Sequence, residues 1–217
     1  LAYFGMRNYG PALDHAKQAI RRNHAIYTYY LSLSRIYASL HNEIMAMAVL
    51  DSALNYDRSL AAVWIAKGDI HKTAERYEDA LNDYKIASSY NLDDWKGYYK
   101  QGVVLYYLGR LDSAQSVLEA AAEKHPHQSG IHHFLGLVHL GKNDLAEAQL
   151  YLTIASEKDS VNGDIWFHLG QAYKHLKQFE QARASLENAI GIDSTHAEAL
   201  YALGQIYIKL DQKEKSQ

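Results

Sequence analysis

The chain contains no cysteine and only two prolines in 217 residues. Without cysteine it cannot form a disulfide, use a catalytic thiol or build a cysteine-ligated zinc site. The scarcity of proline favours helix, because proline interrupts an α-helix more strongly than any other residue. The missing cysteines do not identify a compartment, since reducing and oxidising surroundings both accept such a chain. The location therefore stays unknown, with the cytoplasm and the periplasm as the candidates.

The chain also has no strong net charge and no long apolar run. Its formal net charge is −3 and its sequence pI is about 6.5, so the composition does not call for a nucleic acid or an anionic membrane as partner. No apolar run approaches the ~20 residues that span a bilayer, and no signal peptide is visible. Because the sequence begins with Leu1 rather than Met, we expect a fragment or a processed product that lacks its native N-terminus.

Small residues recur in the sequence with a constant period of 34 residues. One position of this period holds Ser34, Gly68, Gly102, Gly136, Gly170 and Gly204. A second position holds Ala12, Ala46, Ala80, Ala114, Ala148 and Ala182, and a third holds Ala19, Ala53, Ala87, Ala121, Ala155 and Ala189. No insertion or deletion interrupts the three series, so we expect one supersecondary unit repeated along the whole chain.

Helix packing explains why these positions are small. Large side chains lie three and four residues from each of them, as Trp166 and Tyr173 do around Gly170, and this spacing places them on one helical stripe. Two helices can approach closely only where a side chain is small, so we expect the glycine of a first helix to face the alanine of a second helix. The third series is expected to set the distance to the next helical pair.

Residues 163–196 carry the most complete pattern: Trp166, Leu169, Gly170, Tyr173, Ala182, Leu186 and Ala189. This pattern resembles the tetratricopeptide repeat. The resemblance covers the whole chain and implies an all-α fold, a right-handed α-solenoid of stacked helix-turn-helix hairpins. We interpret residues 1–217 as a single array with a partial repeat at 1–26 and a terminal helix at 197–217. The five full repeats are predicted at 27–60, 61–94, 95–128, 129–162 and 163–196.

Local signals for turns and helix caps agree with this register. Gly109 and Asn143 fall in the predicted hairpin turns, where a left-handed residue is favoured. Asp94 and Asn162 precede predicted helices as N-caps. Thr195 and Glu198 have the spacing of a capping box, which predicts that Thr195 caps the last helix.

The resemblance implies that the first helices line a concave groove that binds another protein. The lining positions of the family are mixed and polar in the N-terminal repeats and rich in aromatic and apolar residues in the C-terminal repeats. We predict a partner segment with apolar or aromatic anchors and some acidic residues, since the lining is slightly basic on an acidic chain. The predicted peptide-binding residues are Arg35, Asp69, Lys72, Lys96, Tyr99, Val103, Tyr106, Tyr107, His133, Leu137, Phe167, Gln171, Lys174, Tyr201 and Gln205.

Two other functions remain open. The aromatic side chains could pack within the chain or against a second copy, which would make the array a structural or self-assembling module. The array could also be a regulatory arm of a larger protein, for example one in bacterial envelope assembly or secretion. Both are alternatives to an interaction scaffold, and fold alone does not decide between them.

No pattern in the sequence predicts an enzyme, a cofactor or a metal. Phosphate loops, nucleophile elbows and zinc-protease motifs are absent. His132 and His139 lie seven residues apart, but both occupy the large core positions of the repeat, so we expect packed rings rather than metal ligands. His133 and His168 are expected to meet on adjacent repeats in the groove.

Overall fold

The computed structural model describes residues 9–214, and within this range the chain forms α-helices and no strand. The helices are α1 Tyr9–Arg22, α2 Tyr27–Ser39, α3 Glu43–Tyr56, α4 Ala61–Thr73, α5 Tyr77–Tyr90, α6 Trp95–Tyr107, α7 Leu111–Lys124, α8 Ser129–Lys142, α9 Leu145–Lys158, α10 Gly163–His175, α11 Phe179–Ile192 and α12 Ala197–Glu214. The predicted first-helix tail of the partial repeat, residues 1–8, lies outside the described residues.

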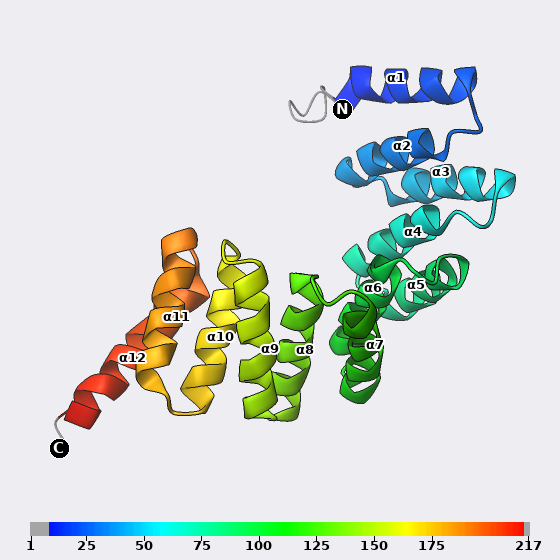
Figure 1. Cartoon of the computed structure of the whole chain (residues 1–217). Helices are drawn as coiled ribbons and strands as arrows, with labels where there is room; N and C mark the ends of the chain where they lie inside the picture. The colour runs from blue at the N-terminus through cyan, green and yellow to red at the C-terminus, as the bar shows by residue number, and fades with distance from the viewer. Residues whose placement is uncertain (1–8, 215–217) are drawn as a thin grey trace. The chain divides into compact units, whose positions relative to one another are not determined.

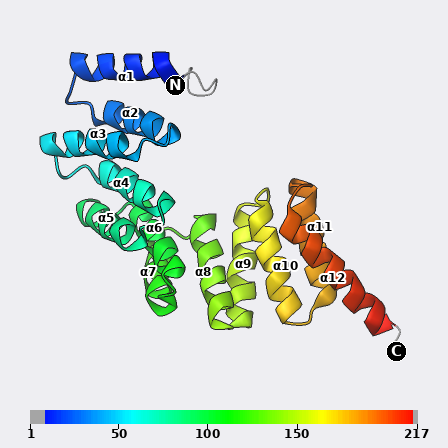
Figure 2. The ribbon, with the colours of Figure 1, turned by 180° about the vertical axis from the view of Figure 1, so that it is seen from behind.

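The chain divides into two compact units, Leu1–Val104 and Leu105–Gln217, and the boundary falls inside α6. In the first unit α2 packs on α3 and α4 packs on α5, while in the second α8 packs on α9 and α10 on α11 (Figures 1 and 2). The first helices of successive hairpins are also in contact: α2 contacts α4, and α10 contacts both α8 and α12. This is the predicted all-α helical-repeat solenoid; the exact repeat boundaries stay a prediction.

The alanine series lie in the core. All five alanines from Ala46 to Ala182 at the second position of the period are fully buried, and those from Ala53 to Ala189 at the third are buried almost as completely. The large residue four positions after the first alanine of each pair is buried with them, as Tyr84 and Leu152 are. Burying such side chains supplies most of the stability of a stacked repeat, since one hairpin alone leaves its apolar faces in water.

Three glycines of the period, Gly68, Gly136 and Gly170, each accommodate a large side chain of the second helix, whereas we expected the alanine to make this contact. A Cβ built on Gly136 would lie 2.5 Å from Leu152 Cγ, and one on Gly170 would lie 2.8 Å from Leu186 Cγ. Gly68 has the same relation to the ring of Tyr84. The hairpin closes at these points because a branched or aromatic residue of the second helix presses against bare backbone of the first.

A ring nitrogen links each of three repeats to the repeat before it. Trp64 Nε1 donates to the carbonyl oxygen of Arg58 at 2.9 Å, and Trp166 Nε1 donates to that of Ser160 at 2.9 Å. His132 stands at the same position and its Nε2 bonds the carbonyl oxygen of Pro126 at 2.9 Å. His132 and His139 stack on the two sides of Tyr151, which confirms that both histidines are packed rings.

Left-handed residues end the first helices in every full hairpin that the structure describes. Gly109 and Asn143 have φ values of 71° and 64°, as predicted, and the same register holds three further residues with positive φ: His41, Glu75 and Lys177. Glu75 and Lys177 were missed because glutamate and lysine do not favour this conformation, and His41 was missed although histidine adopts it more often than most residues. The backbone at this point is therefore dictated by the hairpin rather than by local preference.

Two of the predicted caps are present, and the capping box is wrong. Asp94 accepts from the backbone N–H of Lys96, and Asn162 accepts from that of Asp164. Thr195 instead bonds through its backbone N–H and its hydroxyl to the carboxylate of Asp193. His196 takes over as the cap of α12, because its Nδ1 accepts from the N–H of Ala199 at 3.3 Å.

The strained turns predict a stabilising substitution. A left-handed backbone costs an L-residue about 1–2 kcal/mol, and glycine brings an entropic cost of about 0.5–1 kcal/mol. We therefore expect Glu75→Gly to raise the free energy of unfolding by about 0.5–1 kcal/mol, measured by urea denaturation. The reverse change, Gly109→Ala, should lower it by a similar amount, because only φ opposes the new methyl group there. A stabilised Gly109→Ala would contradict this account of the turns.

The closing contacts predict opposite effects at two glycines. In Gly136→Ala the methyl group must displace the buried Leu152, so we expect a loss of about 1–3 kcal/mol. Gly204 has the same place in the repeat but open space around it, so Gly204→Ala should add about 0.5–1 kcal/mol of helix stability. Thermal melting of both variants checks the pair, and equal destabilisation would show that the side chain facing the glycine is not the cause.

Candidate functional site

The first helices of each unit enclose a hollow. The N-terminal hollow lies between α2 and α4 and has a volume of about 400 Å³. Its lining combines apolar side chains with charged ones: Leu31, Ser34, Arg35, Ala38, His41, Glu43, Ala66, Asp69, Ile70, Thr73 and Ala74. Two of the predicted binding residues, Arg35 and Asp69, therefore face one cavity of a size that suits a ligand side chain or a small molecule.

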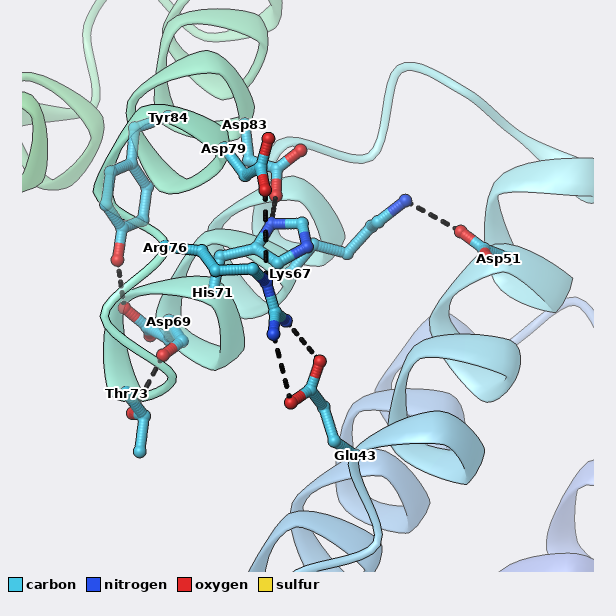
Figure 3. A network of polar contacts seen from close by, with 10 residues as sticks. All are labelled: Glu43, Asp51, Lys67, Asp69, His71, Thr73, Arg76, Asp79, Asp83 and Tyr84. Atoms are coloured by element: carbon cyan, nitrogen blue, oxygen red, sulfur yellow. Dashed lines mark hydrogen bonds and ion pairs between the residues drawn. The ribbon is translucent and has the colours of Figure 1, made fainter.

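The acidic residues of the N-terminal hollow are neutralised from within the chain. Asp69 accepts from the Tyr84 hydroxyl at 2.7 Å and pairs with Lys100 at 2.6 Å. Glu43 forms an ion pair with Arg76 from the next repeat (Figure 3). Burial of Tyr84 raises the pKa of its hydroxyl, and the Asp69 charge adds to that shift. Arg35 is exposed, and its guanidinium has no hydrogen-bond or ion-pair partner among residues 10–211, so it is the cation that this hollow offers to a ligand.

The C-terminal hollow lies between α10 and α12, in the same register of the repeat, and has a volume of about 560 Å³. Its lining residues are Lys174, His175, Lys177, Phe179, Gln205, Ile206, Ile208 and Lys209. Lys174 donates to the side-chain oxygen of Gln205 at 2.6 Å, which joins two predicted binding residues from different helices. No acidic side chain lines this hollow.

A row of contacting rings runs along the first helices of the C-terminal unit. We call Tyr107, Tyr106, Phe134, His133, His168, Phe167 and His196 the ring row, in order of contact. Successive ring centroids lie 4.9–6.0 Å apart, between 4.9 Å for Phe167 and His196 and 6.0 Å for Tyr106 and Phe134. Such edge-on and tilted contacts hold the rings in fixed positions.

The expected meeting of His133 and His168 is confirmed. His133 Nε2 lies 3.0 Å from His168 Nδ1, and that same Nδ1 lies 2.7 Å from the carbonyl oxygen of Asp164. Because a carbonyl oxygen can only accept, His168 carries its proton on Nδ1. The same N–H also points to His133 Nε2, which therefore acts as a second acceptor. Burial, and then the neighbouring His168, lower the pKa of His133 to about 4. Burial also lowers the pKa of His168, so both rings are neutral at pH 7.

The other predicted binding residues occupy different depths. Val103 and Leu137 are buried, with exposed fractions of 5% and 9%, so we remove both from the predicted surface. These short apolar side chains are covered, whereas the longer Arg35 at the same register remains exposed. Tyr201 stands at the register of His133 and Phe167 and is 72% exposed.

The remaining four predicted residues lie outside the hollows and the ring row. Tyr99 contacts the ring of Trp95 at 5.6 Å. Lys72 and Gln171 are half-buried, and Lys96 is exposed at the first turn of α6. The structure therefore does not gather all the predicted residues into one site within either unit.

The sequence interpretation missed three contributors to these surfaces. Phe134 and His196 belong to the ring row, and Phe179 lines the C-terminal hollow. Phe134 lies one residue after a family lining position, and its ring still joins the row. Phe179 occupies the same position of the repeat as Glu43, which lines the N-terminal hollow. Once that hollow is known, the repeat period points to Phe179.

Among the side chains that the structure describes, those of residues 10–211, no group of three or more His, Asp or Glu is placed to hold a metal ion. Over the same residues, no helix has both the length and the apolar character needed to cross a membrane.

Models of the tetratricopeptide repeat match the chain at residues 65–129, 99–152 and 170–211. No curated protein sequence matches it. Together with the repeat period and the helical hairpins, these matches show that the chain belongs to the tetratricopeptide-repeat family. Proteins of this family generally act as non-catalytic scaffolds that bind other proteins or peptides.

Solved structures with the same fold agree. The chain is 25% identical to YrrB, described as a tetratricopeptide-repeat protein with an unusual peptide-binding site, with a TM-score of 0.64 over 88% of this chain and 98% of that one. It superposes on PilF of Pseudomonas aeruginosa with 20% identity and a TM-score of 0.75, over 93% and 87% of the two chains. A repeat protein from Parabacteroides merdae has 16% identity and a TM-score of 0.76, over 98% and 84%.

The histidine pair predicts a loss of stability in mild acid. Because the fold holds His133 neutral, the unfolded chain binds a proton near the ordinary pKa of 6.5 while the folded chain does not until about pH 4. Stability is full above pH 6.5 and falls as pH drops toward 4. We expect urea unfolding to show that His133→Phe abolishes about 2 kcal/mol of the decrease between pH 7.5 and 5.0.

The control for this experiment is His127→Gln, since His127 is an exposed loop residue. It should keep the pH dependence of the original chain. Other groups titrate in both proteins, so the difference between the two variants isolates the buried ring. An unchanged slope in His133→Phe would contradict the assignment of a neutral His133.

Proposed function

We propose that the chain is an interaction scaffold whose C-terminal unit binds a segment of a partner protein along the ring row. Fixed aromatic rings are suited to this task, because they offer a large contact area and lose little conformational entropy on binding. A partner that carries apolar or aromatic anchors would bury them between these rings.

The single observation that carries the proposal is an aromatic surface that keeps exposed members. Tyr107 ends the ring row, with 53% of its area exposed. Tyr201 lies on α12, at the repeat position of His133 and Phe167, and is 72% exposed. Exposed tyrosines beside packed rings are typical of interface residues, since the side chain combines an apolar ring with a polar hydroxyl. The peptide-binding site described for YrrB, at 25% identity, supports the same kind of ligand.

The proposal is tested by selecting binders from a randomised 12-residue peptide library displayed on phage and measuring the best peptide by fluorescence anisotropy. We expect the double variant Tyr107→Ala and Tyr201→Ala to weaken binding by about tenfold or more, because aromatic residues at the centre of an interface carry much of its energy. Circular dichroism checks that the variant keeps its helices.

A matched control is Tyr90→Ala, which removes another exposed tyrosine, at the end of a second helix. It should bind as the original chain does. Equal binding by the double variant would show that the ring row is not the site. Light scattering over a concentration range distinguishes self-assembly, since an array that stacks on itself would grow in mass without any peptide.

A further inference from the structure

The two hollows have the same position in the repeat but opposite chemistry. Four periods separate their equivalent lining residues, so Glu43 corresponds to Phe179, Asp69 to Gln205 and Thr73 to Lys209. Both acidic positions of the N-terminal hollow are thus uncharged in the C-terminal one, and three lysines are added, because Lys174, Lys177 and Lys209 correspond to Ala38, His41 and Thr73. The shared backbone framework presents a mixed charge in one unit and a positive charge in the other.

The lysines of the C-terminal hollow have no carboxylate partner among residues 10–211, the part of the chain whose side chains the structure describes. The Lys174 ammonium bonds only the neutral Gln205, and the side chains of Lys177 and Lys209 make no hydrogen bond or ion pair with residues 10–211. Elsewhere the chain does neutralise lysines by pairing them. Lys67, Lys100 and Lys142 each lie 2.6–2.8 Å from an aspartate of a neighbouring repeat, Asp51, Asp69 and Asp112.

The hollow also has an apolar side. Ile206 is fully buried at its floor, Phe179 is half-buried, and Ile208 is 59% exposed. Three ammonium groups beside such a surface complement a carboxylate that has an apolar neighbour. The net charge of −3 disfavours a long polyanion such as nucleic acid, because the rest of the chain would repel it.

We infer that the C-terminal hollow binds an acidic segment of the partner protein, with an Asp or Glu side chain between Lys174, Lys177 and Lys209 and an adjacent apolar residue on Phe179 and Ile208. This inference rests on the proposed function and gives the chemistry of one part of the bound segment.

The same phage library tests the inference, because its peptides are joined to the carrier at their C-termini and offer only side-chain carboxylates. We expect the original chain to enrich Asp and Glu relative to the unselected library. The double variant Lys174→Glu and Lys209→Glu should lose this enrichment, and it should bind the best acidic peptide about tenfold or more weakly at low salt. Raising the salt to about 0.5 M should weaken the original interaction, since the contacting charges are exposed.

The control variant, Lys85→Glu with Lys158→Glu, changes the net charge equally at exposed positions on second helices. It should keep both the enrichment and the affinity. If selected peptides bind at the ring row but show no acidic excess, or bind the lysine variant unchanged, the inference fails and the proposed function stands. If the library yields no peptide that binds, both are overturned.

Discussion

The structure depends on one contact, in which bare glycine backbone on a first helix meets a large side chain on the second. Gly68 with Tyr84, Gly136 with Leu152 and Gly170 with Leu186 all make it. The contact sets the distance between paired helices and encloses the alanines around it. It thereby fixes which residues of the first helices point away from their own hairpin, and those residues form the hollows and the ring row.

The repeated fold could be predicted because each requirement for a small side chain is visible as a residue type. Alanine and glycine recur in register, and the structure buries nearly all of them. Local conformation was less accessible. Asn143 predicts a left-handed residue in its turn, whereas Glu75 and Lys177 adopt this conformation only because the hairpin imposes it. Thr195 has the spacing of a cap, yet the carboxylate of Asp193 competes successfully for its hydrogen bonds.

The surface could be predicted only in part, because register indicates direction but not depth. It placed His133 and Phe167 on the face where the rings meet, and it equally selected Val103 and Leu137, which are covered. The charge of a hollow is harder still to predict, since it depends on pairs such as Lys100 with Asp69 that are distant in sequence. A count of basic and acidic residues cannot tell a neutralised lysine from one that remains available.

The ring nitrogens that bond a preceding carbonyl have a consequence for how the array loosens. Trp64, His132 and Trp166 each join their repeat to the one before it, although His132 leaves its second ring nitrogen, Nδ1, buried without a hydrogen-bond partner. Leu200 occupies the same position at the start of the last helix and has no such group. Contacts between neighbouring repeats hold such a stack together. The junction before the last helix therefore lacks the ring N–H hydrogen bond that is present at three other junctions. Loss of the last helix, which helps to form the C-terminal hollow, therefore breaks none of the ring N–H bonds that join these three repeats to their neighbours.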